Sequence, residues 1–204
     1  TDSNNTLATV YLINDKTNPS LLCVYYDDNN YSLRYTPLPL DAQKNKGDGS
    51  IENPYRIKTV NDFKRINDEP NANYIIVNDL DFMSTPFNGI EANFTGSLNG
   101  NNYTIHNLVL ENNALFHNIK DSAVVKNIRI DAPTLNISDK YISVAIFANN
   151  LMGGLIDDGV SENGTSMQSY IQNIHITKPQ IIATDDFRGI LGGIVGEASF
   201  YSNI

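Results

Sequence analysis

The sequence predicts an all-β chain built mainly as a parallel β-helix, a solenoid of short stacked strands. Only 18% of the 204 residues are charged, and Asn, Ser, Thr and Asp supply most of the remaining polarity. Those residues favour turns over exposed helices. After residue 73, short apolar runs alternate with Asn, Asp and Gly, and similar segments recur at intervals of about 20 to 23 residues. A repeat of that length with two or three short strands is typical of stacked coils.

The first 45 residues are predicted to form a small β-meander. Three segments rich in β-branched and aromatic residues are separated by turn-forming clusters, a pattern that favours short strands. The polar stretch from Asp41 to Pro54 has no apolar period, so we interpret it as a linker. We therefore expect a meander subdomain at residues 1–45 and a capped β-helix at residues 46–204. The three predicted strands are ATVYLI, LLCVYY (which contains the single cysteine, Cys23) and YSLRYTPL.

One helix is predicted, from Thr59 to Asn67. Either Thr59 or Asn61 can accept hydrogen bonds from the first free backbone N–H groups, as capping residues do. Apolar residues recur at three-residue intervals and form one face. Because the end of a solenoid exposes core side chains and strand edges, we expect this helix to cover the first coil. The apolar face consists of Val60, Phe63 and Ile66.

Two short patterns recur along the predicted solenoid. The first is an Asn followed by two apolar residues spaced by one, with intervals of 20 and then 46 residues, which we interpret as twice 23. We expect Asn107, Asn127 and Asn173 at equivalent coil corners, with their apolar followers stacked in the interior and an intermediate coil near Asn150. The alternative is a β-sandwich, because sandwich turns also favour Asn and Gly. The second pattern comprises Ala114–His117, Ala145–Ala148 and Gly193–Gly196.

Residues 47–196 resemble the GLUG-motif repeat proteins of bacteria. The strongest part is Phe94–Leu110, where Gly96, Gly100 and Asn107 follow in the order that the family uses, and Gly192–Gly196 gives the named motif clearly. The segment Ala145–Ala148 departs from the repeat, since Ala148 stands where a Gly usually closes it. These proteins are secreted or surface-exposed, and the group includes the non-catalytic repeat region of IgA-specific metallopeptidases. The resemblance implies a right-handed β-helix, an extracellular setting and no shared catalytic residues.

The sequence contains no clear catalytic constellation. His106, His117 and His175 lie on strand-like segments without the spacing of a zinc site on a helix, and His175 is expected to point outward. Two acidic clusters could serve a polysaccharide-cleaving enzyme, but we interpret them as solvated loop charges. The segment Asn78–Asp81 is predicted to be an outward-facing strand. We therefore assign no catalytic, cofactor-binding or metal-binding residue. The two acidic clusters are Asp157-Asp158-Gly159 and Asp185-Asp186-Phe187-Arg188.

The net charge of −9, without a Lys/Arg cluster, argues against nucleic acid as a partner. The longest apolar runs, such as Ile190–Val195, are too short for a membrane span. We expect a non-catalytic extracellular binding or adhesion module that recognises a host or matrix protein or carbohydrate. The alternatives are a polysaccharide-acting enzyme and a structural stalk of a secreted peptidase. Because Asn203-Ile204 repeats the start of the Asn127-Ile128 and Asn173-Ile174 pairs, we also expect a truncated solenoid that can self-associate through its open last coil.

Overall fold

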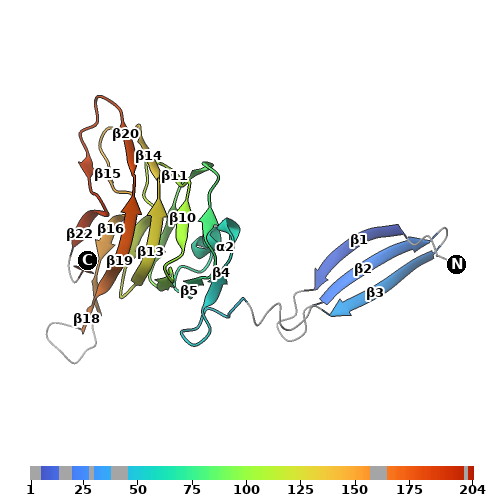
Figure 1. Cartoon of the computed structure of the whole chain (residues 1–204). Helices are drawn as coiled ribbons and strands as arrows, with labels where there is room; N and C mark the ends of the chain where they lie inside the picture. The colour runs from blue at the N-terminus through green and yellow to red at the C-terminus, as the bar shows by residue number, and fades with distance from the viewer. Residues whose placement is uncertain (1–5, 14–19, 28–29, 38–45, 157–164, 200–201) are drawn as a thin grey trace. The chain divides into compact units, whose positions relative to one another are not determined.

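The computed structural model describes residues 6–13, 20–27, 30–37, 46–156, 165–199 and 202–204 (Figure 1). The chain divides into two compact units, Thr1–Lys46 and Gly47–Ile204. No helix among the described residues combines the length and the apolar character needed to cross a membrane.

The first unit contains a three-stranded antiparallel sheet in chain order. Its strands are β1 (Thr6–Ile13), β2 (Ser20–Asp27) and β3 (Asn30–Pro37). β2 pairs along its whole length with β3, from Ser20 opposite Pro37 to Asp27 opposite Asn30. All three segments are rich in β-branched and aromatic residues, which favour strands.

The second unit consists mainly of parallel strands. Its chain passes repeatedly through the same three sheets, and each pass places its strands beside those of the pass before (Figure 1). The largest sheet has the order β23-β19-β13-β9-β5-β4, with β6 and β10 at its side; the other two have the orders β20-β14-β11-β7 and β22-β16-β12-β8. Among the described strands of this unit, every pair except β17–β18 is parallel, which contradicts the β-sandwich alternative.

The strands follow one another in a fixed order. A first strand, β4 (Tyr55–Ile57), precedes the helical segment. The next two passes comprise β5 (Asn73–Ile76), β6 (Leu80–Asp81), β7 (Pro86–Phe87) and β8 (Ile90–Phe94), then β9 (Ser97–Asn99), β10 (Thr104–His106), β11 (Val109–Glu111) and β12 (Phe116–Lys120). The later passes comprise β13 (Val124–Asp131), β14 (Thr134–Ile137), β15 (Ser143–Val144) and β16 (Ala148–Met152), then β19 (Ser169–Thr177), β20 (Gln180–Ala183), β21 (Ile190–Leu191) and β22 (Val195–Ser199), and finally β23 (Ser202–Asn203).

The length of a pass varies more than the sequence predicts. Ser97 lies opposite Asn73, 24 residues earlier. The 46 residues between Asn127 and Asn173 span a single pass, because β13 pairs directly with β19. The predicted intermediate coil near Asn150 is therefore wrong. The extra length includes an antiparallel pair, β17 (Gly154–Ile156) with β18 (Thr165–Met167).

The prediction that three asparagines share one corner is correct for two of them. Asn127 and Asn173 adopt φ values of 58° and 52°, and the Asn173 side chain donates to Asn127 Oδ1 at 2.8 Å. Asn107 lies at a different corner: it directly follows His106, which pairs with Asp131, so its counterpart is Ala132. Both corners need left-handed backbone, for which Asn is well suited. The sequence pattern therefore cannot tell the two corners apart.

The apolar side chains form columns across the passes, though not all of those predicted. Leu80, Ile105 and Ile130 lie in register and are 2%, 0% and 1% exposed. Leu110 stacks on Leu135 instead of on Ile130, which corrects the predicted column. The second recurring pattern is also offset, since Phe116 lies opposite Ala148 and not opposite the corresponding Phe147. Three phenylalanines still meet in the core, with successive ring centroids 5.3 and 5.7 Å apart: Phe94, Phe116 and Phe147.

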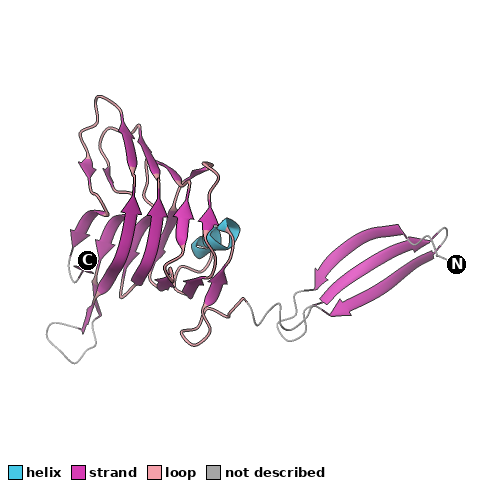
Figure 2. Ribbon diagram, in the orientation of Figure 1, coloured by secondary structure: helices cyan, strands magenta, loops and turns pink. Residues whose placement is uncertain are grey.

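The predicted helix is present as α2 (Val60–Lys64) followed by a 3₁₀ turn, η1 (Arg65–Asn67), at the β4 end of the sheets (Figure 2). Thr59 caps it: the Thr59 hydroxyl accepts from the Asp62 backbone N–H, and the Asp62 carboxylate accepts from the Thr59 backbone N–H. Such a reciprocal arrangement stabilises a helix start. Phe63 and Ile66 are fully buried, as predicted.

The last pass leaves more apolar surface exposed than the others. Its exposed aliphatic side chains are Ile181 (38%), Ile182 (57%), Ile190 (52%) and Leu191 (46%). β23 adds a further parallel strand beside β19, with Ser202 opposite Ser169 and Asn203 opposite Tyr170. Asn203 therefore does not repeat the position of Asn173, which corrects the predicted match.

Candidate functional site

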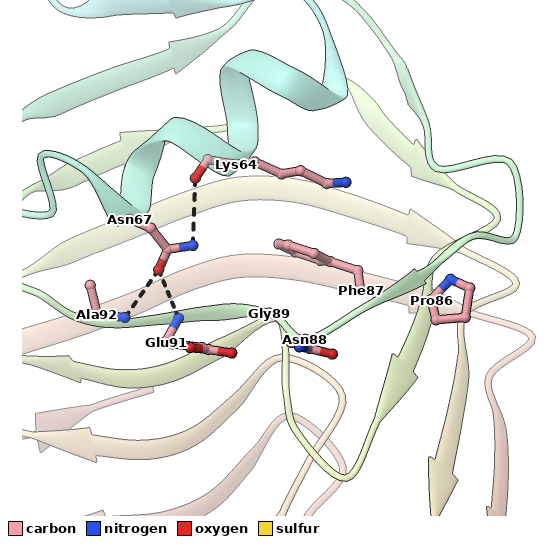
Figure 3. Close-up of a pocket in the computed structure, with 8 residues that line it drawn as sticks. All are labelled: Lys64, Asn67, Pro86, Phe87, Asn88, Gly89, Glu91 and Ala92. Atoms are coloured by element: carbon pink, nitrogen blue, oxygen red, sulfur yellow. Dashed lines mark hydrogen bonds between the residues drawn. The ribbon is translucent and has the colours of Figure 1, made fainter.

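A groove of about 750 Å³ lies between the helical segment and the chain around β7 and β8 (Figure 3). Lys64 and Asn67 line one side, and residues 86–89, 91 and 92 line the other. The side chain of Lys64 extends over the Phe87 ring, with its Nζ atom 5.6 Å from the ring centroid. The groove also presents the Glu91 carboxylate and the Asn88 amide, so its surface combines both signs of charge with one largely buried aromatic ring.

Much of this groove serves the fold. Asn67 Oδ1 accepts hydrogen bonds from the backbone N–H groups of Glu91 (2.9 Å) and Ala92 (3.1 Å). This bridge fixes η1 against β8 (Figure 3). Gly89 has φ +80°, and a Cβ atom there would lie 2.0 Å from the carbonyl oxygen of Ala114. The groove thus depends on backbone packing that admits only glycine at this position.

A second hollow, of about 240 Å³, lies on the outer face of the large sheet. Three successive passes contribute to it, through the loop before β10, strand β13 and strand β19. The lining side chains are two amides, one guanidinium and one imidazole. They belong to Asn102, Arg129, Asn173 and His175.

Strand register and side-chain alternation position this cluster. Arg129 pairs with Thr104 on one side and with His175 on the other. Because Ile128 and Ile130 are buried, the residue between them points to the opposite face. Arg129 and His175 are accordingly exposed, and the predicted outward direction of His175 is confirmed. Neighbouring strands lie about 4.8 Å apart, so these two side chains are close neighbours on the face.

The asparagines of the hollow belong to a hydrogen-bonded ladder. Asn127 Nδ2 donates to Asn99 Oδ1 at 3.0 Å, and Asn173 Nδ2 donates to Asn127 Oδ1 at 2.8 Å. Asn102, at φ 61°, occupies the matching loop of the preceding pass, where its backbone N–H donates to the Asn127 carbonyl at 2.9 Å. The ladder holds the edge of the hollow in a fixed conformation.

The carboxylates on this face have partners of their own. Asp131, two residues beyond Arg129, accepts a 2.6 Å hydrogen bond from Thr177 Oγ1, and its Oδ2 atom lies 4.0 Å from His106 Nδ1. The Thr177 hydroxyl lowers the pKa of Asp131. Asp81 similarly accepts from Asn107 Nδ2 at 2.8 Å, which lowers the pKa of Asp81. Within the described part of the chain, no carboxylate lies within ion-pair distance of the Arg129 guanidinium.

The residues weighed in the sequence as candidates for chemistry are dispersed. His117 is exposed on β12, in a different sheet from His106 and His175. Over residues 46–153 and 168–199, no group of three His, Cys, Asp or Glu side chains could hold a metal ion. The predicted outward strand at Asn78–Asp81 is present only as β6 (Leu80–Asp81), with Leu80 buried and Asp81 exposed; Asn78 and Asp79 are exposed but lie outside the strand.

The acidic pair at Asp185 and Asp186 lies in an exposed loop. Asp186 accepts from Thr184 Oγ1 at 2.9 Å and pairs with Lys140 Nζ at 3.6 Å. Arg188 donates to the backbone oxygens of Asp185 and Phe187. Lys140 belongs to the corresponding loop of the preceding pass, whereas the contacts of Thr184 and Arg188 are local; all of these charged residues are exposed, as expected for solvated charges. The other acidic candidates, Asp157 and Asp158, lie outside the described residues.

Arg129 was missed as a site residue by sequence reasoning. The sequence nevertheless contains a signal for it. Arg129 stands between two isoleucines, and it falls opposite His175 when Asn127 and Asn173 are aligned.

None of the protein-family models, curated proteins or solved structures with which the chain was compared matches this chain.

Proposed function

We propose that residues 47–204 form a right-handed parallel β-helix that acts as a non-catalytic binding or adhesion module of a secreted or surface protein of bacteria. The repeated passage of the chain through three parallel sheets supports the scaffold. The GLUG-like segments Phe94–Leu110 and Gly192–Gly196 support the handedness and the extracellular setting. The ligand is an extracellular carbohydrate or protein.

The single observation that carries this proposal is the hollow on the outer face of the large sheet. Side chains from three passes converge there although they are far apart in the sequence. Strand register fixes the backbone positions of these residues, and the asparagine ladder holds the Asn173 side chain, so part of the surface is arranged before any ligand binds. Such preorganisation reduces the entropic cost of binding.

A ligand screen with two matched variants tests the proposal. The chain is applied to arrays of glycans and of extracellular matrix proteins, and binding is quantified for each hit. His175→Trp fills the hollow, whereas His117→Trp places the same bulk on an exposed strand of a different sheet. We expect His175→Trp to abolish binding and His117→Trp to leave it unchanged. Absence of any ligand, or equal effects of the two substitutions, would refute the proposal.

An enzymatic screen addresses the non-catalytic part. Acidic and neutral polysaccharides are incubated with the chain, and new reducing or unsaturated ends are measured. We expect no turnover. Turnover that Asp185→Ala or Asp186→Ala abolishes would replace the binding function with a polysaccharide-acting enzyme.

A further inference from the structure

We propose that the hollow is a subsite for an anionic group of an acidic polysaccharide, with Arg129 as the residue that binds the carboxylate or sulfate. This inference rests on the proposed binding function and adds the chemical class of the ligand.

The charge distribution on the outer face favours an anion. The chain as a whole carries a net charge of −9. On strands β13 and β19, however, the outward residues include Lys126, Arg129 and His175, and Lys178 follows directly after β19. The one carboxylate on the same stretch, Asp131, is held ionised by the hydrogen bond from Thr177, but it is outnumbered by Lys126, Arg129 and Lys178. A locally positive surface on an acidic protein attracts negatively charged ligands.

The chemistry of Arg129 narrows the class of group. A guanidinium presents a planar fork of N–H donors that matches the two oxygens of a carboxylate or sulfate. Its partners in the hollow, Asn102 and Asn173, carry amides that can both donate to and accept from hydroxyl groups. An acidic sugar offers an anionic group and hydroxyls on one ring, which is the combination that this set of side chains can bind.

The size and openness of the hollow favour a polymer. A volume of about 240 Å³ is below the roughly 300–1,000 Å³ of pockets that enclose a whole ligand, so one sugar unit is held while its neighbours remain outside. Lys126 lies further along β13 on the same face and is available to a second anionic group of the same chain. Several weak contacts along one polymer raise its overall affinity above that of an isolated anion.

Binding measurements with defined probes test the inference. The probes are polygalacturonate (carboxylate), heparin (sulfate), dextran (neutral), and inorganic phosphate and sulfate alone. We expect the two acidic polymers to bind, dextran not to bind, and the inorganic ions to compete only weakly. Binding of the polymers should also weaken as the salt concentration rises, because exposed charges are screened.

Two arginine variants provide a matched comparison. Arg129→Gln should weaken binding of the acidic polymer about 10- to 100-fold, as expected for loss of a charge-assisted hydrogen bond. Arg56→Gln makes the same change in net charge on β4, at an exposed position three strands from β13 in the same sheet, and should have no effect. Arg129→Lys keeps the charge without the fork and should give an intermediate affinity. Circular dichroism of each variant establishes that it is folded.

The outcomes separate this inference from the proposed function. If dextran binds as well as the acidic polymers, or if Arg129→Gln and Arg56→Gln have equal effects, the anionic subsite is refuted. If a neutral glycan or a protein binds and only His175→Trp blocks it, the binding function stands and this inference falls. If inorganic sulfate or phosphate competes as strongly as the polymer, the site binds free anions and the polysaccharide class is wrong. If none of these probes binds, the anionic subsite is refuted, and the binding function falls only if the array screen also finds no ligand.

Discussion

Replacement of Phe63 by alanine provides the sharpest test of how the β4 end of the second unit is closed. The Phe63 ring is fully buried, and its centroid lies 6.0, 6.4 and 6.2 Å from those of Phe82, Phe87 and Phe116. Removing a buried Phe side chain costs about 3–5 kcal/mol, and each aromatic pair adds about 0.5–1.5 kcal/mol beyond burial. With three such pairs, we expect a loss near the upper end of that range, about 4–5 kcal/mol in the free energy of unfolding.

Urea unfolding followed by far-ultraviolet circular dichroism measures this loss. The transition of Gly47–Ile204 is recognised by its larger m value, since m grows with the surface exposed on unfolding. Asn61→Ala, at an exposed position of the same helix, should change stability by less than about 0.5 kcal/mol. Phe63→Leu keeps most of the apolar volume and should fall between the two. A loss below about 1 kcal/mol for Phe63→Ala would show that the helix does not close the core.

Three further changes test other parts of the structure. Asn127→Ala removes hydrogen bonds to two asparagines and places alanine at φ 58°, so the free energy of unfolding in urea should fall by about 2–3 kcal/mol. Asn127→Gly removes the same bonds but tolerates this φ, so its loss should be smaller; equal losses would contradict a backbone contribution. Thr177→Val should raise the pKa of Asp131 toward 3.8 in an NMR titration, and an unchanged pKa would contradict the role of the Thr177 hydroxyl. Because folding lowers this pKa, Asp131 contributes to stability at pH values above its unfolded-state pKa. That contribution is lost as the pH falls through the folded-state pKa. The exposed Ile182 and Leu191 predict concentration-dependent association in light scattering, reduced by Ile182→Lys, whereas a monomer at high concentration would contradict it.

Local signals in the sequence were sufficient for the helix. The Thr59 cap and the apolar spacing of Phe63 and Ile66 are encoded within nine residues, so no distant contact had to be known. The stacking of Asn127 on Asn173 was also accessible, because the residues after them share the same spacing. The position of Asn107 was not accessible, since Ala132 and Lys178 adopt left-handed backbone at its corner without any asparagine.

The candidate site depended on information that the sequence spacing could not supply. The outward direction of Arg129 follows from its two isoleucine neighbours. That His175 lies beside Arg129 could be predicted only by treating the 46 residues from Asn127 to Asn173 as a single pass, as their strand pairing shows. Two passes of 23 residues would have separated these side chains by an additional strand. Periodicity alone cannot distinguish a doubled repeat from a single repeat that carries an insertion.

The junction between β16 and β19 has a consequence for how such a chain can vary. The Ser169 hydroxyl donates to the Met152 carbonyl at 2.7 Å, and Ser169 is fully buried, so the ends of the excursion through β17 and β18 are fastened together at the sheet. Closing a loop between fixed ends becomes only slowly more costly with length, by about 0.6 kcal/mol for each doubling. Segments of different length could therefore be grafted between Met152 and Ser169 while the strands on either side keep their neighbours. This makes the junction a suitable position for displaying a foreign epitope or reporter.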